Sequence, residues 1–124
     1  MNNRYQEITD VLQRYFDGLY YCDIAILETV FHPKAQYATT SSGALLHYDM
    51  PTYMNVIKDR TPPADTGDPY GFEITSIQFA GNDTAHAVLQ CTIMGKHFTD
   101  FLSLVRTQSN WQIIAKVFHF DLAA

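Results

Sequence analysis

The chain has 124 residues, of which 47% are hydrophobic and 17% charged, a composition that excludes bulk disorder and allows one hydrophobic core. Eight Lys and Arg against thirteen Asp and Glu give a net charge of −5, and the scattered basic residues argue against a nucleic-acid partner. No apolar run approaches the ~20 residues of a bilayer span, and Cys22 and Cys91 lack metal-site spacing. We therefore expect a single cytoplasmic domain over residues 1–124, with no membrane, metal or cofactor.

Apolar residues at intervals of three and four predict an amphipathic helix from the candidate N-cap Asn3 to Tyr20. A shorter helix follows the candidate cap Asp23, carries Phe31 on its apolar side and ends at Pro33. The apolar stripe of the first helix comprises Ile8, Val11, Leu12, Tyr15, Phe16, Leu19 and Tyr20.

The middle of the chain predicts a hairpin over residues 35–48, and Asp49 and Pro51 then open a third short helix. Residues 61–71 (TPPADTGDPYG) contain three prolines and two glycines, which exclude regular structure. This segment is either a surface connection or a flap over the mouth of a pocket.

The last part of the chain predicts an antiparallel meander, because apolar runs alternate with turn residues. Its strands are expected over residues 72–80, 84–94, 97–106 and 111–120. Helices followed by such a meander indicate the α+β class.

The turns of the meander fix an expected register. A two-residue turn over 95–96 pairs Met94 with His97, and a loop over 107–110 pairs Arg106 with Trp111. Two ionisable residues, Asp100 and His119, then share the apolar face that the helices cover. The other members of this face are Ala87, Leu89, Cys91, Ile93, Phe98, Leu102, Leu104, Ile113, Ala115 and Val117.

A carboxylate on an apolar face is costly unless it is paired, which leaves two interpretations of Asp100 and His119. In the first, they form a structural hydrogen-bonded pair, or Asp100 simply lies near a wet end of the sheet. In the second, they act as general base or acid and polar partner in a cavity between sheet and helices. Tyr15 is either core or a ligand hydrogen-bonding group. The cavity walls are expected from Phe16, Tyr20, Cys91, Phe98, Leu102 and Val117.

The opposite face of the sheet carries large apolar residues, which is unusual for a half-exposed antiparallel sheet. They are Val88, Phe101, Val105, Ile114, Phe118 and Phe120. We therefore expect a two-fold homodimer in which one sheet packs against the other.

The segments 20–37 (YYCDIAILETVFHPKAQY) and 100–119, together with the element order, resemble the nuclear transport factor 2-like superfamily. Within it, the chain most resembles the branch that includes the putative lumazine-binding and SnoaL-like or ketosteroid-isomerase-like families. The resemblance implies a cystatin-like roll, in which a strongly curved antiparallel sheet wraps around helices and encloses a ligand cavity. In ketosteroid-isomerase-like relatives an inward aspartate abstracts a proton and a helix tyrosine helps to stabilise the oxyanion; here Asp100 and Tyr15 would take these positions, whereas the second acidic donor has no counterpart.

Three functions remain open from the sequence. The first is a cofactor-independent isomerase or lyase acting on a small apolar or aromatic molecule, with Asp100 as base and His119 and Tyr15 assisting. The second is a non-catalytic binder of a pterin-like or flavin-like ring. The third is a dimeric accessory module whose interior is simply filled.

Overall fold

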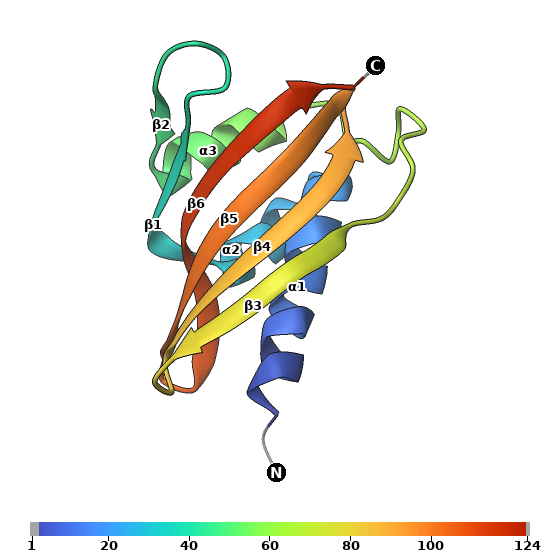
Figure 1. Cartoon of the computed structure of the whole chain (residues 1–124). Coiled ribbons are helices and arrows are strands. Elements are labelled where there is room, and N and C mark those ends of the chain that lie inside the picture. The colour runs from blue at the N-terminus through green and yellow to red at the C-terminus, as the bar shows by residue number, and fades with distance from the viewer. Residues whose placement is uncertain (1–2, 124) are drawn as a thin grey trace.

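The computed structural model describes residues 3–123, so the expected domain of 1–124 extends beyond this range by residues 1, 2 and 124. Three helices lie on one side of a curved six-stranded sheet (Figure 1). The helices are α1 (Arg4–Tyr20), α2 (Ile24–Val30) and α3 (Met50–Lys58). The strands are β1 (Phe31–Thr39), β2 (Leu46–Tyr48), β3 (Glu73–Ala80), β4 (Thr84–Ile93), β5 (Lys96–Thr107) and β6 (Asn110–Leu122).

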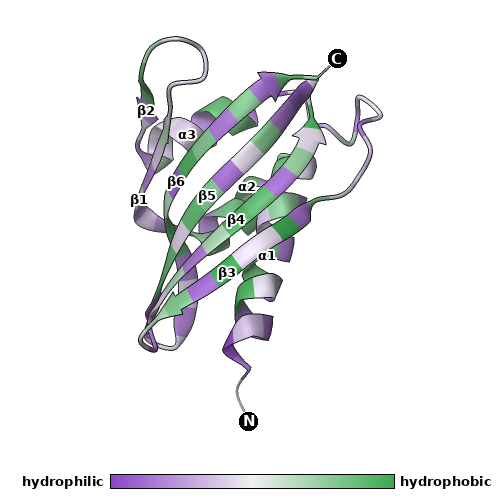
Figure 2. Cartoon of the chain, viewed as in Figure 1, coloured by the Kyte–Doolittle hydropathy of each residue, from purple (hydrophilic) through white to green (hydrophobic). Residues whose placement is uncertain are grey.

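The sheet has the strand order β2-β1-β6-β5-β4-β3. The expected α+β class and curved sheet are confirmed, with one addition: β1 runs parallel to β6, so the sheet is mixed. Along β4, β5 and β6, hydrophobic and hydrophilic residues alternate (Figure 2), as they do when one face of a sheet packs on helices. None of the helices within residues 3–123 is long and apolar enough to cross a membrane.

The helices begin at the caps that the sequence predicts. The side chains of Asn3, Asp23 and Asp49 each accept a hydrogen bond from the backbone N–H three residues later. The expected end of α2 at Pro33 is wrong, because α2 stops at Val30 and Phe31 already pairs with β6. The Phe31 ring is buried between α1 and α3, which ties the start of β1 to both helices.

The β4–β5 turn lies one residue earlier than predicted, which shifts the pairing of the two strands by two residues. Met94 and Gly95 form it with φ angles of 55° and 69°, so Ile93 pairs with Lys96. Positive φ at both central residues is the geometry of a tight hairpin. Because side chains alternate with a period of two, the shift leaves every residue of β4 and β5 on its predicted face. Asp100 therefore still points toward the helices, opposite Leu89.

The β5–β6 pairing contains a β-bulge that the sequence analysis missed. Arg106 pairs with Trp111 as predicted, but Ile114 is an additional residue in β6, since Leu104 faces Ile113 and Ser103 faces Ala115. One additional residue reverses the alternation for the rest of the strand. The predicted inward placement of Ala115, Val117 and His119 is therefore wrong, as is the predicted outward placement of Phe118 and Phe120. The residues of β6 that face the helices beyond the bulge are Lys116, Phe118 and Phe120.

Candidate functional site

A cavity of about 290 Å³ lies between the concave face of the sheet and the helices. It is bounded by the β1–β2 hairpin, the β4–β5 turn and the end of α3, which lie at the same end of the molecule (Figure 1). Its walls are largely aromatic and aliphatic, and its charged lining residues are Asp100, Lys116, Arg60 and Lys96. The aromatic lining residues are Tyr37, Tyr48, Tyr53, Phe98, Phe118 and Phe120.

Asp100 on β5 is the one acidic residue of this lining and is only 3% exposed. Its Oδ2 accepts a hydrogen bond of 2.7 Å from the hydroxyl of Tyr15 on α1. Its Oδ1 is buried and has no hydrogen-bond partner within residues 3–123. A buried acceptor left in this state costs about 1–3 kcal/mol, so Oδ1 is the atom best suited to accept a proton or a hydrogen bond from a ligand.

Tyr15 is fully enclosed and acts as a fixed donor to Asp100. Burial raises the pKa of its hydroxyl well above the usual value, and the negative charge of Asp100 raises it further. The hydroxyl therefore keeps its proton and orients the carboxylate. Its ring packs edge-on against Phe31, with the ring centroids 5.8 Å apart.

Lys116 is the buried cation of the cavity, and only 5% of it is exposed. Its Nζ donates a 3.2 Å hydrogen bond to the hydroxyl of Tyr53 and lies 5.0–5.6 Å from the centroids of four aromatic rings. These rings belong to Tyr15, Tyr37, Tyr53 and Phe118. Burial lowers the pKa of Lys116, but Tyr53 and the carboxylate of Asp100 raise it by more, so the ammonium stays charged.

Lys116 and Asp100 share the inner face without forming an ion pair. They lie on neighbouring strands in diagonal positions, because Leu102 faces Lys116 and Asp100 faces Phe118. Diagonal residues are about 7–8 Å apart, and the ion pairs found within residues 3–123 include neither group. Within the described residues, the carboxylate and the ammonium therefore do not neutralise each other directly.

Two residues expected in the walls, Cys91 and Phe98, line the cavity. Burial raises the pKa of the Cys91 thiol from 9.0 to about 12, and Asp100 adds to the effect, so Cys91 is a neutral wall residue and not a thiolate. Leu102 is completely buried in the core beneath the cavity and is not among its lining residues.

His119, expected to be the partner of Asp100, lies on the opposite face of the sheet. Its Nδ1 is 2.9 Å from Oγ of Ser41, its Nε2 is 3.0 Å from Oδ1 of Asp121, and 63% of its side chain is exposed. The predicted pairing with Asp100 is wrong because the bulge at Ile114 turns His119 outward. Val117, which was expected in the wall, is 51% exposed on the same outer face.

Phe16 and Tyr20, also expected in the wall, pack instead beneath the segment 61–71. With Ile93 they form a separate buried cluster, and neither lines the cavity. The segment is held there because the N–H of Ala64 donates to the carbonyl of Tyr20 and the Tyr20 hydroxyl donates to the carbonyl of Asp68. The segment is thus attached to the end of α1 by both backbone and side-chain bonds.

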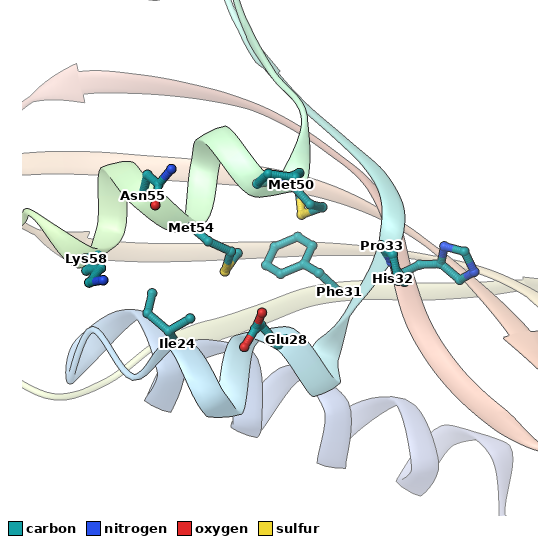
Figure 3. A pocket seen from close by; sticks show the side chains of 10 residues that line it. Ile24, Glu28, Phe31, His32, Pro33, Met50, Met54, Asn55 and Lys58 are labelled. Atoms are coloured by element: carbon teal, nitrogen blue, oxygen red, sulfur yellow. The ribbon is translucent and has the colours of Figure 1, made fainter.

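A second cavity, larger at about 430 Å³, lies between α2 and α3 on the outside of the helices. Figure 3 shows Met50, Met54 and Phe31 between the two helices, with Glu28 rising from α2 and Lys58 at the far end of α3. Glu28 and Lys58 are exposed, and no predicted site residue lines this cavity. Although it is smaller, the inner cavity is the stronger candidate, since it alone of the two holds buried ionisable groups.

Within residues 3–123, no three His, Cys, Asp or Glu side chains gather where they could hold a metal ion. The chemistry available to the inner cavity is that of a carboxylate oxygen, an ammonium and a phenol hydroxyl on an aromatic background. Sequence reasoning found the carboxylate but missed Lys116 and Tyr53. A signal for Lys116 was present in β6, because the large apolar residues change from odd to even positions after Ile113.

Comparison with known proteins agrees with this architecture. No curated protein matches the chain significantly. Two similar solved structures are nuclear transport factor 2-like proteins of unknown function. That from Silicibacter pomeroyi is 24% identical, with a TM-score of 0.84 over 95% of this chain and 96% of the other. That from Shewanella baltica is 24% identical, with a TM-score of 0.84 over 97% and 95%. A cystatin-like fold protein from Burkholderia xenovorans is 14% identical, with a TM-score of 0.69 over 96% and 92%.

These structural similarities establish the fold, and a sequence comparison establishes the family. A family model described as "Putative lumazine-binding" matches residues 3–119, which is nearly the whole chain. The chain therefore belongs to the putative lumazine-binding family and has the nuclear transport factor 2-like fold that the sequence predicts.

Proposed function

We propose that this chain, as one domain over residues 1–124, binds a small planar molecule in the inner cavity. The observation that carries the proposal is the unpartnered Oδ1 of Asp100, which shares one inner face with an ammonium, that of Lys116, bonded to a phenol and to no carboxylate within residues 3–123. A ligand edge with a donor beside an acceptor satisfies both at once. The N–H and C=O of a cyclic amide, as found in pterin-like and flavin-like rings, have this arrangement.

The walls support a flat ring as the body of the ligand. Tyr37 stacks on Tyr48 with centroids 5.1 Å apart, and Phe98 and Phe118 lie 5.9 Å apart on neighbouring strands. Aromatic walls with a few convergent polar groups are typical of sites for small organic molecules. The description of the family points to the same class of ligand.

Titration with lumazine and with pterin, followed by ligand fluorescence and calorimetry, tests this proposal. We expect saturable binding to the wild type and a loss of at least tenfold in affinity in Asp100→Asn and in Lys116→Met. Asp121→Asn, on the exposed outer face, is the matched control and should bind as the wild type does. The proposal fails if the wild type binds neither ring, or if Asp100→Asn and Asp121→Asn bind equally well.

Proton abstraction beside a carbonyl is a second candidate function, and it is favoured by the same free oxygen of Asp100. Oδ1 would act as general base, while the ammonium of Lys116 and the hydroxyl of Tyr53 would stabilise the oxygen of the resulting enolate. Lys116 and Tyr53 take the assisting position that the sequence analysis gave to His119. This is the chemistry of a cofactor-independent isomerase or lyase.

Exchange of the α-protons of 2-tetralone in D₂O, followed by NMR, tests the catalytic candidate. We expect the wild type to accelerate exchange and Asp100→Asn to abolish the acceleration, with Asp121→Asn unchanged. If exchange with the wild type is no faster than in buffer alone, the catalytic candidate is contradicted and binding remains the proposed function.

We further propose a homodimer formed through the outer face of the sheet. Val88, Phe101 and Val117 form a row across β4, β5 and β6, and both Phe101 and Val117 are about half exposed. A row of this kind is suited to a self-complementary interface. Light scattering should give the mass of a dimer for the wild type and of a monomer for Phe101→Asp; a monomeric wild type at micromolar concentration would contradict the proposal.

A further inference from the structure

The inner cavity has a charge balance opposite to that of the whole chain. The chain carries thirteen acidic and eight basic residues, yet three of the basic residues and one acidic residue line the cavity. The three basic lining residues are Arg60, Lys96 and Lys116. A cavity that gathers cations in an acidic protein attracts anions.

Arg60 and Lys96 are nearer to solvent than Lys116. Arg60 lies two residues beyond the end of α3, Lys96 is the first residue of β5, and both are half-buried, whereas Lys116 is only 5% exposed. This gradient of exposure places two cations near the mouth of the cavity and one in its depth. The aromatic walls lie between them and include Phe120, whose ring centroid is 4.7 Å from Nζ of Lys96.

The two cations near the mouth have no counter-ion in the part of the chain that the structure describes. Three basic residues elsewhere have polar partners: Nε of Arg106 lies 2.8 Å from Oδ1 of Asp83, and Arg4 donates to the carbonyl of Gly81. Arg14 donates to the hydroxyl of Thr29. The arginine and lysine of the mouth thus differ from these three in that they line the cavity and that, within residues 3–123, their side chains have neither a hydrogen bond nor an ion pair.

We propose that the natural ligand is an organic anion whose carboxylate lies between Arg60 and Lys96 while its ring occupies the aromatic part of the cavity. The planar guanidinium of an arginine can bind a carboxylate through two parallel hydrogen bonds, and the lysine adds a point charge. The inference rests on the proposed function in that both use the inner cavity. It adds the class of ligand, a small aromatic carboxylate.

Binding of 2-naphthoate and of its methyl ester tests the inference, because neither carries the N–H donor that the proposed contact with Asp100 needs. At low ionic strength we expect the wild type to bind 2-naphthoate at least tenfold more tightly than the ester. Since the mouth is open to solvent, this preference should decrease as salt is added.

The variants Arg60→Gln and Lys96→Gln should each lower the affinity for 2-naphthoate severalfold, and the double variant should bind acid and ester alike. Lys58→Gln, two residues from Arg60 but exposed and outside the inner cavity, is the matched control and should keep the full preference. Circular dichroism of each variant checks that it is folded.

The outcomes separate this inference from the proposed function. A wild type without a preference for 2-naphthoate, or a double variant that keeps the preference, overturns the inference and leaves the lumazine and pterin titrations to decide the proposed function. The protein could instead prefer 2-naphthoate through Arg60 and Lys96 and yet bind neither lumazine nor pterin. That result would support the inference and contradict only the proposed contact between Asp100 and a cyclic amide.

Discussion

The two faces of β6 carry ionisable residues in contrasting environments. On the inner face, Lys116 is 5% exposed and lies diagonal to Asp100, whose Oδ1 has no hydrogen-bond partner within residues 3–123. On the outer face, His119 is 63% exposed, contacts Ser41 and pairs with Asp121. Surface pairs of the outer kind contribute about 0–1 kcal/mol, whereas buried charges cost several kcal/mol when they are unpaired. The same strand therefore carries a buried cation on one face and an ordinary surface pair on the other.

The largest effect in this comparison is expected from reversing the buried charge. Lys116→Glu would place a second carboxylate on the inner face with Asp100 and remove the cation, and a buried charge left uncompensated costs about 3–5 kcal/mol. We expect the variant to be strongly destabilised or unfolded in urea denaturation followed by circular dichroism.

His119→Glu is the matched substitution on the outer face, where it places a carboxylate near Asp121 in contact with water. It should cost less than about 1 kcal/mol, since exposed charges are screened. Equal losses from the two variants would contradict the placement of Lys116 inside and His119 outside.

The contrast between the faces also separates what the sequence predicts from what it does not. The caps Asn3, Asp23 and Asp49 and the stripe of α1 were predictable because local hydrogen bonds and a period of 3.6 fix them. The inward position of Asp100 was predictable although the β4–β5 turn lies one residue earlier, because the pairing then shifts by two residues and the faces are preserved.

The position of Lys116 was not predictable from turn lengths. The bulge at Ile114 adds one residue within the strand, and a shift of one residue exchanges the two faces. The residue types did indicate the bulge. A register without a bulge leaves Phe118 and Phe120 outside and buries His119, whereas the bulge turns the two phenylalanine rings inward. When the large apolar residues of a strand change from odd to even positions, a bulge should therefore be considered together with the turn lengths in predicting the register.

An effect of intermediate size is expected from removing the donor of the buried carboxylate. Tyr15→Phe leaves both oxygens of Asp100 without a partner within residues 3–123, which costs about 1–3 kcal/mol. Urea denaturation should show this loss. Tyr5→Phe, on the exposed side of α1, is the control and should be neutral. Stability unchanged in Tyr15→Phe would mean that the hydrogen bond to Asp100 does not stabilise the fold.

A smaller effect should appear at alkaline pH, because the pKa values of two groups that line the inner cavity are raised. Burial raises the pKa of the Cys91 thiol from 9.0 to about 12 and that of the Tyr37 hydroxyl from 10.0 to about 12. The folded protein thus keeps protons that the unfolded chain loses, so this contribution to stability is complete below about pH 9 and is lost as the pH rises to about 12.

Urea denaturation across this pH range measures the loss, and Cys91→Ala should reduce its slope. Because Cys91 is only partly buried, we expect the difference from the wild type to be smaller than the effect of Tyr15→Phe. A slope that Cys91→Ala leaves unchanged would show that the thiol does not contribute.

The smallest effect is expected at His119, the residue that the regular register placed beside Asp100. His119→Gln keeps a polar side chain beside Ser41 and Asp121 on an exposed surface, where substitutions usually change stability by less than about 0.5 kcal/mol. We expect lumazine affinity and 2-tetralone exchange to equal those of the wild type, because the sheet separates the imidazole from the cavity. A tenfold loss of either would place the imidazole at the site after all, and would imply that β6 can adopt the register without the bulge.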